Sequence, residues 1–395
     1  MSKLEHAIPE ELLLEIFQHL DPAHDLRSVL STSRQFARIA RPLAFSAFTV
    51  AIYGRNNALE MPDPDTLGKS KSRIDFFLSA NIAPLVRSCL VFLHRNFGGG
   101  DEEKYPEYDS YPWLDYLLGR LDALIQLRDL RILHLYLPFS ALPAIQSLPQ
   151  LRTLDLEQCS LYSYDAEDEP LRDSASPLLQ VLRLPRIDAW ASPCAWNTFI
   201  SPQHLVELSA SISWRGPSWW NQKPSDVPVL PHVRKLTIFI SPRGNWDSDG
   251  SAILRSKFPA VQEIIVVTAN GERVRALELE ALVGEALCSV SSVRRLLAPV
   301  GAISQAALTE LPLTHYSSFV PKTSRRYPET ADTLTDLRPS NTLTSLALVL
   351  GYIVIAELST IIAFFPHLAQ LRVEFSDCDA ADDDDYDLDL GLRPR

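Results

Sequence analysis

The feature that most constrains the fold is a spacing of aliphatic residues that recurs along most of the chain. The segment LPQLRTLDLEQCSL places Leu151, Leu154, Leu156, Cys159 and Leu161 at the intervals L-x-x-L-x-L-x-x-C-x-L. The L-x-x-L-x-L core, with aliphatic substitutions, also begins at 130, 179, 233, 261, 343 and 368, and more weakly at 205 and 293. A spacing that mostly falls between 21 and 32 residues indicates stacked supersecondary units that share one core.

This pattern resembles that of leucine-rich repeats. The resemblance implies an α/β fold, an irregular solenoid with parallel strands on one side and helices or loops on the convex side. One gap of 50 residues, after position 293, has room for a degenerate unit near LPLTHYSSF and a loop. Before residue 130, LVRSCLVF is predicted to be an early strand and WLDYLLGRLDALIQL a helix.

The residues between the aliphatic positions are predicted to form a concave surface, because side chains alternate along a strand. This surface mixes charged, polar and aromatic side chains, a composition that suits protein recognition. Its predicted target-binding residues are His134, Tyr136, Asp155, Glu157, Arg183, Lys235, Phe239, Arg295 and Arg372. Trp219 and Trp220, in the loop SWRGPSWWNQKPSD, either bind a partner or are buried against the solenoid, and burial is favoured.

The first fifty residues show a different period, typical of three short helices. Leu12, Leu13, Ile16, Phe17 and Leu20 form one stripe of the first helix, which ends at Asp21-Pro22. Asp25 is predicted to cap the second helix and Ser33 the third, which Arg41-Pro42 should stop. Apolar residues off the main stripe exceed what so small a unit can bury by itself. A partner, or the rest of the chain, must cover them.

The segment IPEELLLEIFQHLDPAHDLRSVLSTSRQFARIARPLAF resembles an F-box, including the fungal type, over about 40 of 395 residues. The resemblance implies that these helices bind the Skp-type adaptor of a cullin-based ubiquitin ligase. The residues divided between that interface and the small helical core are Ile8, Pro9, Leu12, Leu13, Ile16, Leu26 and Leu30. The alternative is a helical cap that only closes the edge of the repeat domain.

Catalytic, cofactor and metal sites are not expected. The five cysteines lie 35 or more residues apart, without metal-ligand spacing. Cys159 occupies the frame position that satisfies backbone groups in a repeat, so a structural role is favoured over a nucleophilic one. The apolar stretch 346–365 could span a membrane, but Glu357 near its middle favours a buried strand followed by a buried helix.

Charge and composition suggest the boundaries of the domains. We predict an F-box at 1–48, a linker or the start of the solenoid at 49–81, repeats at 82–376 and an acidic, disordered tail at 377–395. The net charge is -12, and residues 374–395 hold nine acids against two arginines. This balance argues against nucleic acid, whose affinity depends on Lys and Arg. The tail either keeps the chain solvated or docks on a basic partner.

These features predict the substrate receptor of a Skp-cullin-F-box ligase. The F-box would hold the adaptor, and through it a cullin, while the repeats would hold a protein target. Two other interpretations remain: an F-box scaffold that binds the adaptor without ubiquitylation, and an unrelated protein-binding solenoid. An enzyme on a repeat scaffold is disfavoured, because no acid-base pair or nucleophile stands out. The absence of a signal-peptide pattern favours a cytoplasmic or nuclear location.

Overall fold

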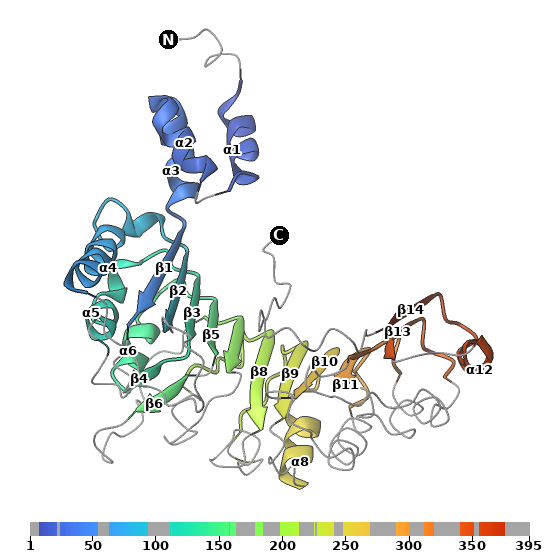
Figure 1. Cartoon of the computed structure of the whole chain (residues 1–395). Coiled ribbons are helices and arrows are strands. Elements are labelled where there is room, and N and C mark those ends of the chain that lie inside the picture. Colours follow the sequence, from blue (N-terminus) through green and yellow to red (C-terminus); the bar gives the residue numbers. More distant parts are fainter. Residues whose placement is uncertain are drawn as a thin grey trace.

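The structure is a computed structural model of the 395-residue chain. It describes residues 8–21, 24–53, 63–93, 111, 113–157, 159–162, 178–184, 198–212, 225, 227–240, 248–268, 290–299, 312–319, 340–350 and 355–375. The described chain contains N-terminal helices followed by one long parallel sheet with helices on one of its faces (Figure 1).

Three helices form the N-terminal unit: α1 (Glu10–Gln18), α2 (Asp25–Thr32) and α3 (Arg34–Ala44). Ser33 caps α3 as predicted, its side-chain oxygen accepting a hydrogen bond from the backbone N–H of Phe36 at 3.2 Å. The unit has a small core of its own, separate from that of the sheet, made of Leu13, Phe17, Leu26, Ile39 and Ala40.

The predicted end of the third helix was wrong, because α3 continues through Pro42 to Ala44. A proline inside a helix removes one backbone hydrogen bond. Here the next turn still closes, since the N–H of Phe45 donates to the carbonyl of Arg41 at 3.2 Å. Leu43 and Ala44 also pack against the small helical core, and that packing holds the last turn in place.

Among the described residues, twelve strands pair in parallel, in an order that follows the chain. They are β1 (Ala47–Ile52), β2 (Ser88–Leu93), β3 (Asp129–Leu133), β5 (Thr153–Glu157), β7 (Val181–Leu184), β8 (Glu207–Ile212), β9 (Lys235–Ile240), β10 (Glu263–Thr268), β11 (Arg295–Pro299), β12 (His315–Phe319), β13 (Ser345–Leu350) and β14 (Gln370–Phe375). A small second sheet pairs β4 (Tyr136–Pro138) with β6 (Ser160–Tyr162). β1 follows α3 directly, and the other strands of the large sheet run parallel to β1. All of these strands therefore begin at the edge nearest the N-terminal helices (Figure 1).

One face of the large sheet is covered by helices (Figure 1). These are α4 (Pro64–Phe77), α5 (Leu114–Leu118), α6 (Ala141–Gln146), α8 (Ser248–Lys257) and α12 (Ile355–Phe364), with the short 3-10 turns η2 (Ala83–Leu85) and η4 (Leu121–Ala123). Their apolar side chains and those of the strands form one continuous core. We call the other side of the sheet the open face, and it carries the strand residues that alternate with the core residues.

The frame LPQLRTLDLEQCSL is confirmed, because all five of its frame residues are at most 2% exposed. The frame that begins at Leu130 was wrong. Leu130 pairs in register with Leu154, and Ile132 with Leu156, so the true frame begins three residues earlier, at Leu127. Only this earlier frame continues with aliphatic residues to its last position. The later one would place polar Ser140 there.

The helix predicted over WLDYLLGRLDALIQL is shorter than expected, since it is limited to α5 and followed by the 3-10 turn η4. Other predicted elements are found where expected. The early strand is β2, and the degenerate unit in the long gap supplies β12, which pairs with β11 and β13. The apolar stretch 346–365 divides into β13 and α12. Residues 49–81 hold most of β1 and also α4, a helix that the sequence analysis did not predict. Asp63 caps α4 by accepting from the N–H of Thr66 at 3.0 Å.

Candidate interaction surfaces

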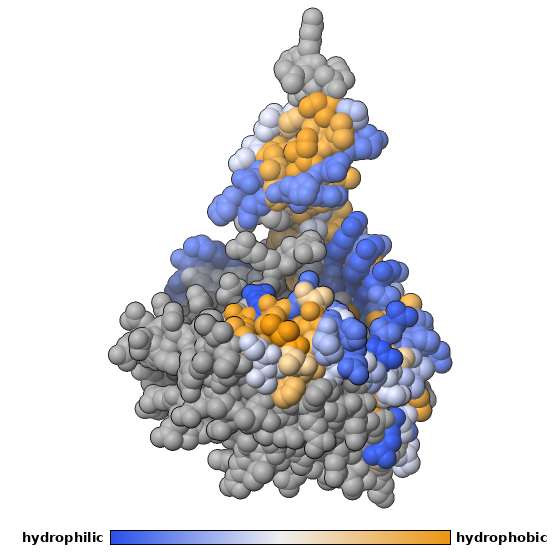
Figure 2. Space-filling model, turned by 90° about the vertical axis from the view of Figure 1, so that its right-hand side faces the viewer, coloured by the Kyte–Doolittle hydropathy of each residue, from blue (hydrophilic) through white to orange (hydrophobic). Residues whose placement is uncertain are grey.

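The outer side of α1 presents large apolar side chains to solvent. Leu12 is 50% exposed, Ile16 is 51% exposed and Leu14 is 38% exposed, whereas Leu13 and Phe17 are buried. Figure 2 views the side on which α1 lies in Figure 1, and it shows apolar side chains gathered over the helical unit. Positions 12 and 16 are one helical turn apart, so they form a patch that the unit does not bury.

The residues predicted for the adaptor interface therefore divide into three groups. Leu13 and Leu26 belong to the small helical core. Ile8 and Leu30 are half-buried against that core, and Pro9, Leu12 and Ile16 are exposed. The surplus of apolar residues noted in the sequence thus resolves into a core and an outward apolar surface.

The N-terminal segment matches a family model. The chain carries an F-box-like domain at residues 6–45, and α1 to α3 fall within it. A search of curated proteins finds no relative that matches the chain. The predicted F-box is thereby supported at the level of the domain.

Ion pairs link neighbouring strands across the open face. Arg131 on β3 lies 3.4 Å from a carboxylate oxygen of Asp155 and 2.9 Å from one of Glu157, both on β5. Arg183 on β7 lies 3.7 Å from Asp155 and 3.0 Å from Glu207 on β8. We call these five residues the ion-pair ladder. Acids and bases alternate along it, so the ladder presents little net charge.

The ladder continues more weakly along later strands. Lys235 on β9 lies 3.9 Å from Glu207, and Arg295 on β11 lies 3.6 Å from Glu263 on β10. Arg295 is 61% exposed at its side chain, so this pair is screened by solvent and contributes little stability. The described charges are therefore most enclosed around β5 and β7.

Asp155 is the most enclosed acid of the ladder, with 7% of its surface exposed. Burial raises the pKa of its carboxyl group above the ordinary value, because a charge in a poorly hydrated site is costly. Arg131 and Arg183 act in the opposite direction but do not outweigh burial. Asp155 was predicted on the concave surface, and it lies on the open face with its side chain largely enclosed.

Most of the predicted target-binding residues lie on the open face, spread from β5 to β14. They are Asp155, Glu157, Arg183, Lys235, Phe239, Arg295 and Arg372, which occupy strand positions that alternate with the core. Phe239 is half-buried and in register with Val267 of β10. This set offers paired charges with an aromatic side chain on β9 to a partner.

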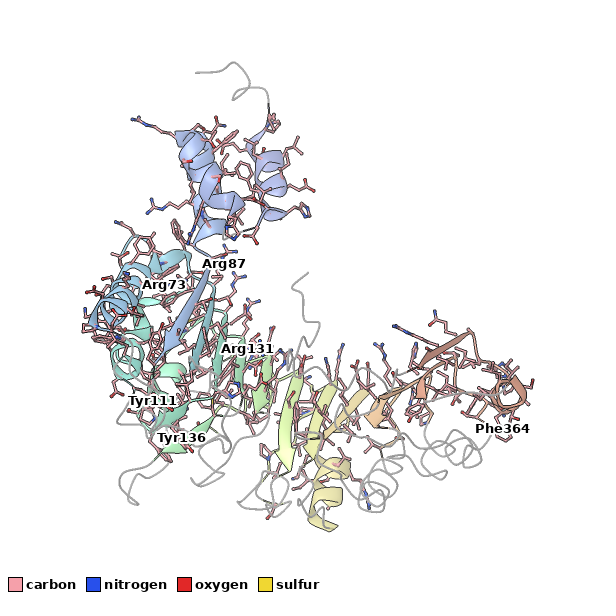
Figure 3. All side chains as sticks on the ribbon, in the orientation of Figure 1. Arg73, Arg87, Tyr111, Arg131, Tyr136 and Phe364 are labelled. Carbon is pink, nitrogen blue, oxygen red and sulfur yellow. The ribbon has the colours of Figure 1, made fainter. Side chains whose placement is uncertain are left out.

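His134 and Tyr136 were placed wrongly, as a consequence of the shifted frame. His134 lies just beyond β3 with a φ of 59°, and its N–H donates to the carbonyl of Glu157 at 2.8 Å. Tyr136 belongs to β4, in the small second sheet, and Figure 3 shows it well away from the labelled Arg131. The open-face residues that the sequence analysis missed on β3 are Arg131 and Leu133. The frame starting at Leu127 would have identified them.

Cys159 has the surroundings of a structural residue. It is fully buried, and its thiol lies 3.2 Å from the carbonyl oxygen of Ile132, in the geometry of a hydrogen bond donated by the thiol. Burial raises the pKa of the Cys159 thiol to about 12. A thiol held in its protonated form is a poor nucleophile.

The described residues contain neither a metal-binding cluster nor a helix suited to span a membrane. Among the described residues, no group of three or more His, Cys, Asp or Glu side chains is arranged to hold a metal ion. Across the same residues, no helix has the length and apolarity needed to span a membrane. Trp219, Trp220 and the predicted tail 377–395 lie outside the described residues.

Proposed function

We propose that this chain is the substrate receptor of a Skp-cullin-F-box ubiquitin ligase. The observation that carries the proposal is the exposed apolar side of α1, within a segment that matches an F-box-like domain. Covering Leu12 and Ile16 with a partner would remove apolar surface from water, at roughly 25 cal/mol per Å². A Skp-type adaptor is the partner expected for such a domain.

In this proposal the large sheet is a leucine-rich-repeat solenoid that holds a protein target. Its frame residues stack in register from strand to strand, which supports the repeat interpretation. The open face, with its paired charges and Phe239, is the proposed target surface, and specificity comes from electrostatic and shape complementarity. The chain itself performs no chemistry. It raises the effective concentration of target beside the ligase core.

A scaffold that binds the adaptor without ubiquitylation shares the same α1 surface, so the structure favours neither role over the other. The third possibility, an unrelated protein-binding solenoid, explains neither the F-box-like match nor the exposed apolar patch on α1. Co-purification distinguishes the first two, since a scaffold brings down the adaptor alone and a receptor brings down the cullin as well.

The test of adaptor binding is the double variant Leu12→Glu with Ile16→Glu in the full chain. The matched control is Ile125→Glu with Val229→Glu, which changes two apolar residues that are 48% and 47% exposed away from the helical unit. Both variants add the same charge and spare both cores. Binding of purified Skp-type adaptor is measured by calorimetry, and folding by circular dichroism.

We expect the α1 variant to lose adaptor binding by at least about 100-fold, because glutamates at the contact must be desolvated without partners. The control variant should bind as the unchanged chain does. Equal binding by all three proteins would rule out α1 as the adaptor surface.

A further inference from the structure

A row of arginines runs along the edge at which the strands of the large sheet begin. The residue just before each strand joins the same ladder of backbone hydrogen bonds, in which Arg152 N–H, for example, donates to the carbonyl of Arg128 at 2.8 Å. From β1 to β14 these residues are Ser46, Arg87, Arg128, Arg152, Gln180, Val206, Arg234, Gln262, Arg294, Thr314, Thr344 and Ala369. Five are arginines and none is acidic. Figure 3 shows Arg87 at this edge, near the N-terminal helices.

The arginines of the row and those of the open face differ in their ion pairing with carboxylates. On the open face the described arginines of β3, β7 and β11 each have a carboxylate within ion-pairing distance. Within the described part of the chain, no carboxylate lies within that distance of any arginine in the row. Arg152, Arg234 and Arg294 are exposed, and the Arg294 guanidinium donates to the carbonyls of Ser291 and Val293.

The sequence supplies an oppositely charged segment directly after the last strand. Residues 376–395 contain eight aspartates and two arginines, a net charge of -6, and four of the aspartates are consecutive, at 382–385. Guanidinium groups bind carboxylates with paired hydrogen bonds, which makes arginine the favoured partner for such a segment. A row of arginines with no acid within it therefore has a complement in the same chain.

The segment is long enough to reach part of the row. Neighbouring strands lie roughly 4.8 Å apart, so β11, β9 and β5 are roughly 14, 24 and 38 Å from β14 along the sheet. β14 ends at the edge opposite the row, and a path from that edge to the row over the open face covers roughly 20 Å, the length of six strand residues. Fourteen extended residues, as far as Asp389, span roughly 46 Å. Arg294 and Arg234 are easily reached, Arg152 only at near full extension, and Arg87 and Arg128 lie beyond.

We infer that the acidic segment 376–395 binds the arginine row at Arg152, Arg234 and Arg294, as an intramolecular ligand. This binding does not depend on the proposed function.

The experiment uses a fluorescent peptide of residues 376–395 and the chain truncated after Phe375. Fluorescence anisotropy measures binding at low and high NaCl concentration, with a second peptide whose eight aspartates are asparagines. The row variant is Arg152→Gln, Arg234→Gln and Arg294→Gln. The matched control is Arg73→Gln, Arg255→Gln and Lys257→Gln, which removes three positive charges from helices α4 and α8.

We expect the truncated chain to bind the acidic peptide, to release it at high salt and to bind the asparagine peptide at least about tenfold more weakly. The row variant should weaken binding at least about tenfold, and the helix variant less than about twofold. The full chain should bind the added peptide at least about tenfold more weakly than the truncated chain, because its own segment occupies the row.

Equal affinity of the full and truncated chains for the peptide would overturn the inference. So would equal weakening by the row and helix variants, since the attraction would then depend only on net charge. Melting temperatures of both variants verify that they are folded. No adaptor or target is present, so failure here leaves the proposed function intact, and failure of adaptor binding leaves this inference intact.

Discussion

Leu154 and Asp155 are neighbours on β5, yet their side chains lie on opposite faces of the sheet. Leu154 is completely buried in the core shared with the helices. Asp155 lies on the open face between Arg131 and Arg183. Both residues are enclosed, for different reasons: one by apolar packing and the other by charged neighbours. Substitutions at the two positions should therefore destabilise the protein by different mechanisms.

Leu154→Asp should unfold the middle of the sheet. The substitution buries an unpaired carboxylate and removes a leucine whose truncation alone costs about 2 to 5 kcal/mol. Because each strand packs mainly on its neighbours, β3 and β7 should lose protection with β5. Hydrogen exchange should show faster exchange in these three strands, with α1 to α3 unchanged. Exchange that stays slow in β5 would mean that the frame register is wrong.

Asp155→Asn tests whether burial or ion pairing controls the carboxyl group. Since burial raises its pKa in the folded chain, the folded protein takes up a proton at a higher pH than the unfolded chain does. Stability of the unchanged chain relative to the Asn variant should therefore increase as the pH falls from above the folded pKa to about 3.9, the ordinary value for aspartate.

The measurement is the difference in urea-unfolding free energy between the unchanged chain and the Asn variant, from pH 7 down to pH 4. Contributions from other acids cancel in this difference. A difference that decreases as the pH falls would show that Arg131 and Arg183 outweigh burial and hold the pKa of Asp155 below its usual range.

Phe17→Ala should destabilise the helical unit and spare the sheet. Phe17 is 5% exposed, and its ring packs edge-on against Phe36 with the centroids 5.5 Å apart. Removing a buried aromatic ring costs about 3 to 5 kcal/mol, a large loss for so small a core. Limited proteolysis should cut within residues 8–45 while the sheet stays intact. Simultaneous loss of the sheet would show that the two cores fold as one.

Cys89 and Cys159 should resist alkylation in the folded protein. Burial raises the pKa of each thiol to about 12, so the thiolate that reacts is scarce at pH 8. Mass spectrometry after iodoacetamide treatment should find both cysteines unmodified, and both modified once urea unfolds the chain. Rapid modification of Cys159 in the folded chain would restore it as a candidate nucleophile.

The core was the most predictable part of the fold. An aliphatic frame repeated in stacked units places most of its residues in the shared core, so even the weak copies at 205 and 293 were found in register. Leu371, on the terminal strand β14, is an exception at 36% exposed. The error arose where the sequence offers two overlapping frames, LRDLRIL and LRILHLYL. Local spacing fits both, and only the residues further along distinguish them.

The surfaces were less predictable, because exposure depends on neighbours far apart in the sequence. Leu12 and Leu13 have the same chemistry and adjoin each other, yet only contacts with α2 and α3 determine which one is buried. Likewise Asp155 appears in the sequence as an ordinary surface acid. Its enclosure results from Arg131 and Arg183, which lie 24 and 28 positions away in the chain. The arginine row emerges only once strand register aligns residues from separate repeats.

The last prediction places target binding on the open face and tests it against the side of the sheet where β4 and β6 lie. Lys235→Glu with Phe239→Ala removes a cation and a half-buried ring from β9. The comparison variant is Tyr136→Ala, which removes a half-buried ring from β4, in the small second sheet. Each variant is expressed as a proximity-labelling fusion, and the labelled proteins are compared with those of the unchanged chain.

An aromatic anchor in a recognition surface accounts for about 2 kcal/mol or more of binding, roughly a 30-fold change in affinity. The β9 variant should therefore lose its targets and keep the adaptor, and Tyr136→Ala should keep both. If Tyr136→Ala loses the targets and the β9 variant keeps them, recognition takes place at the β4–β6 side, and the ion-pair ladder serves only to hold the strands together.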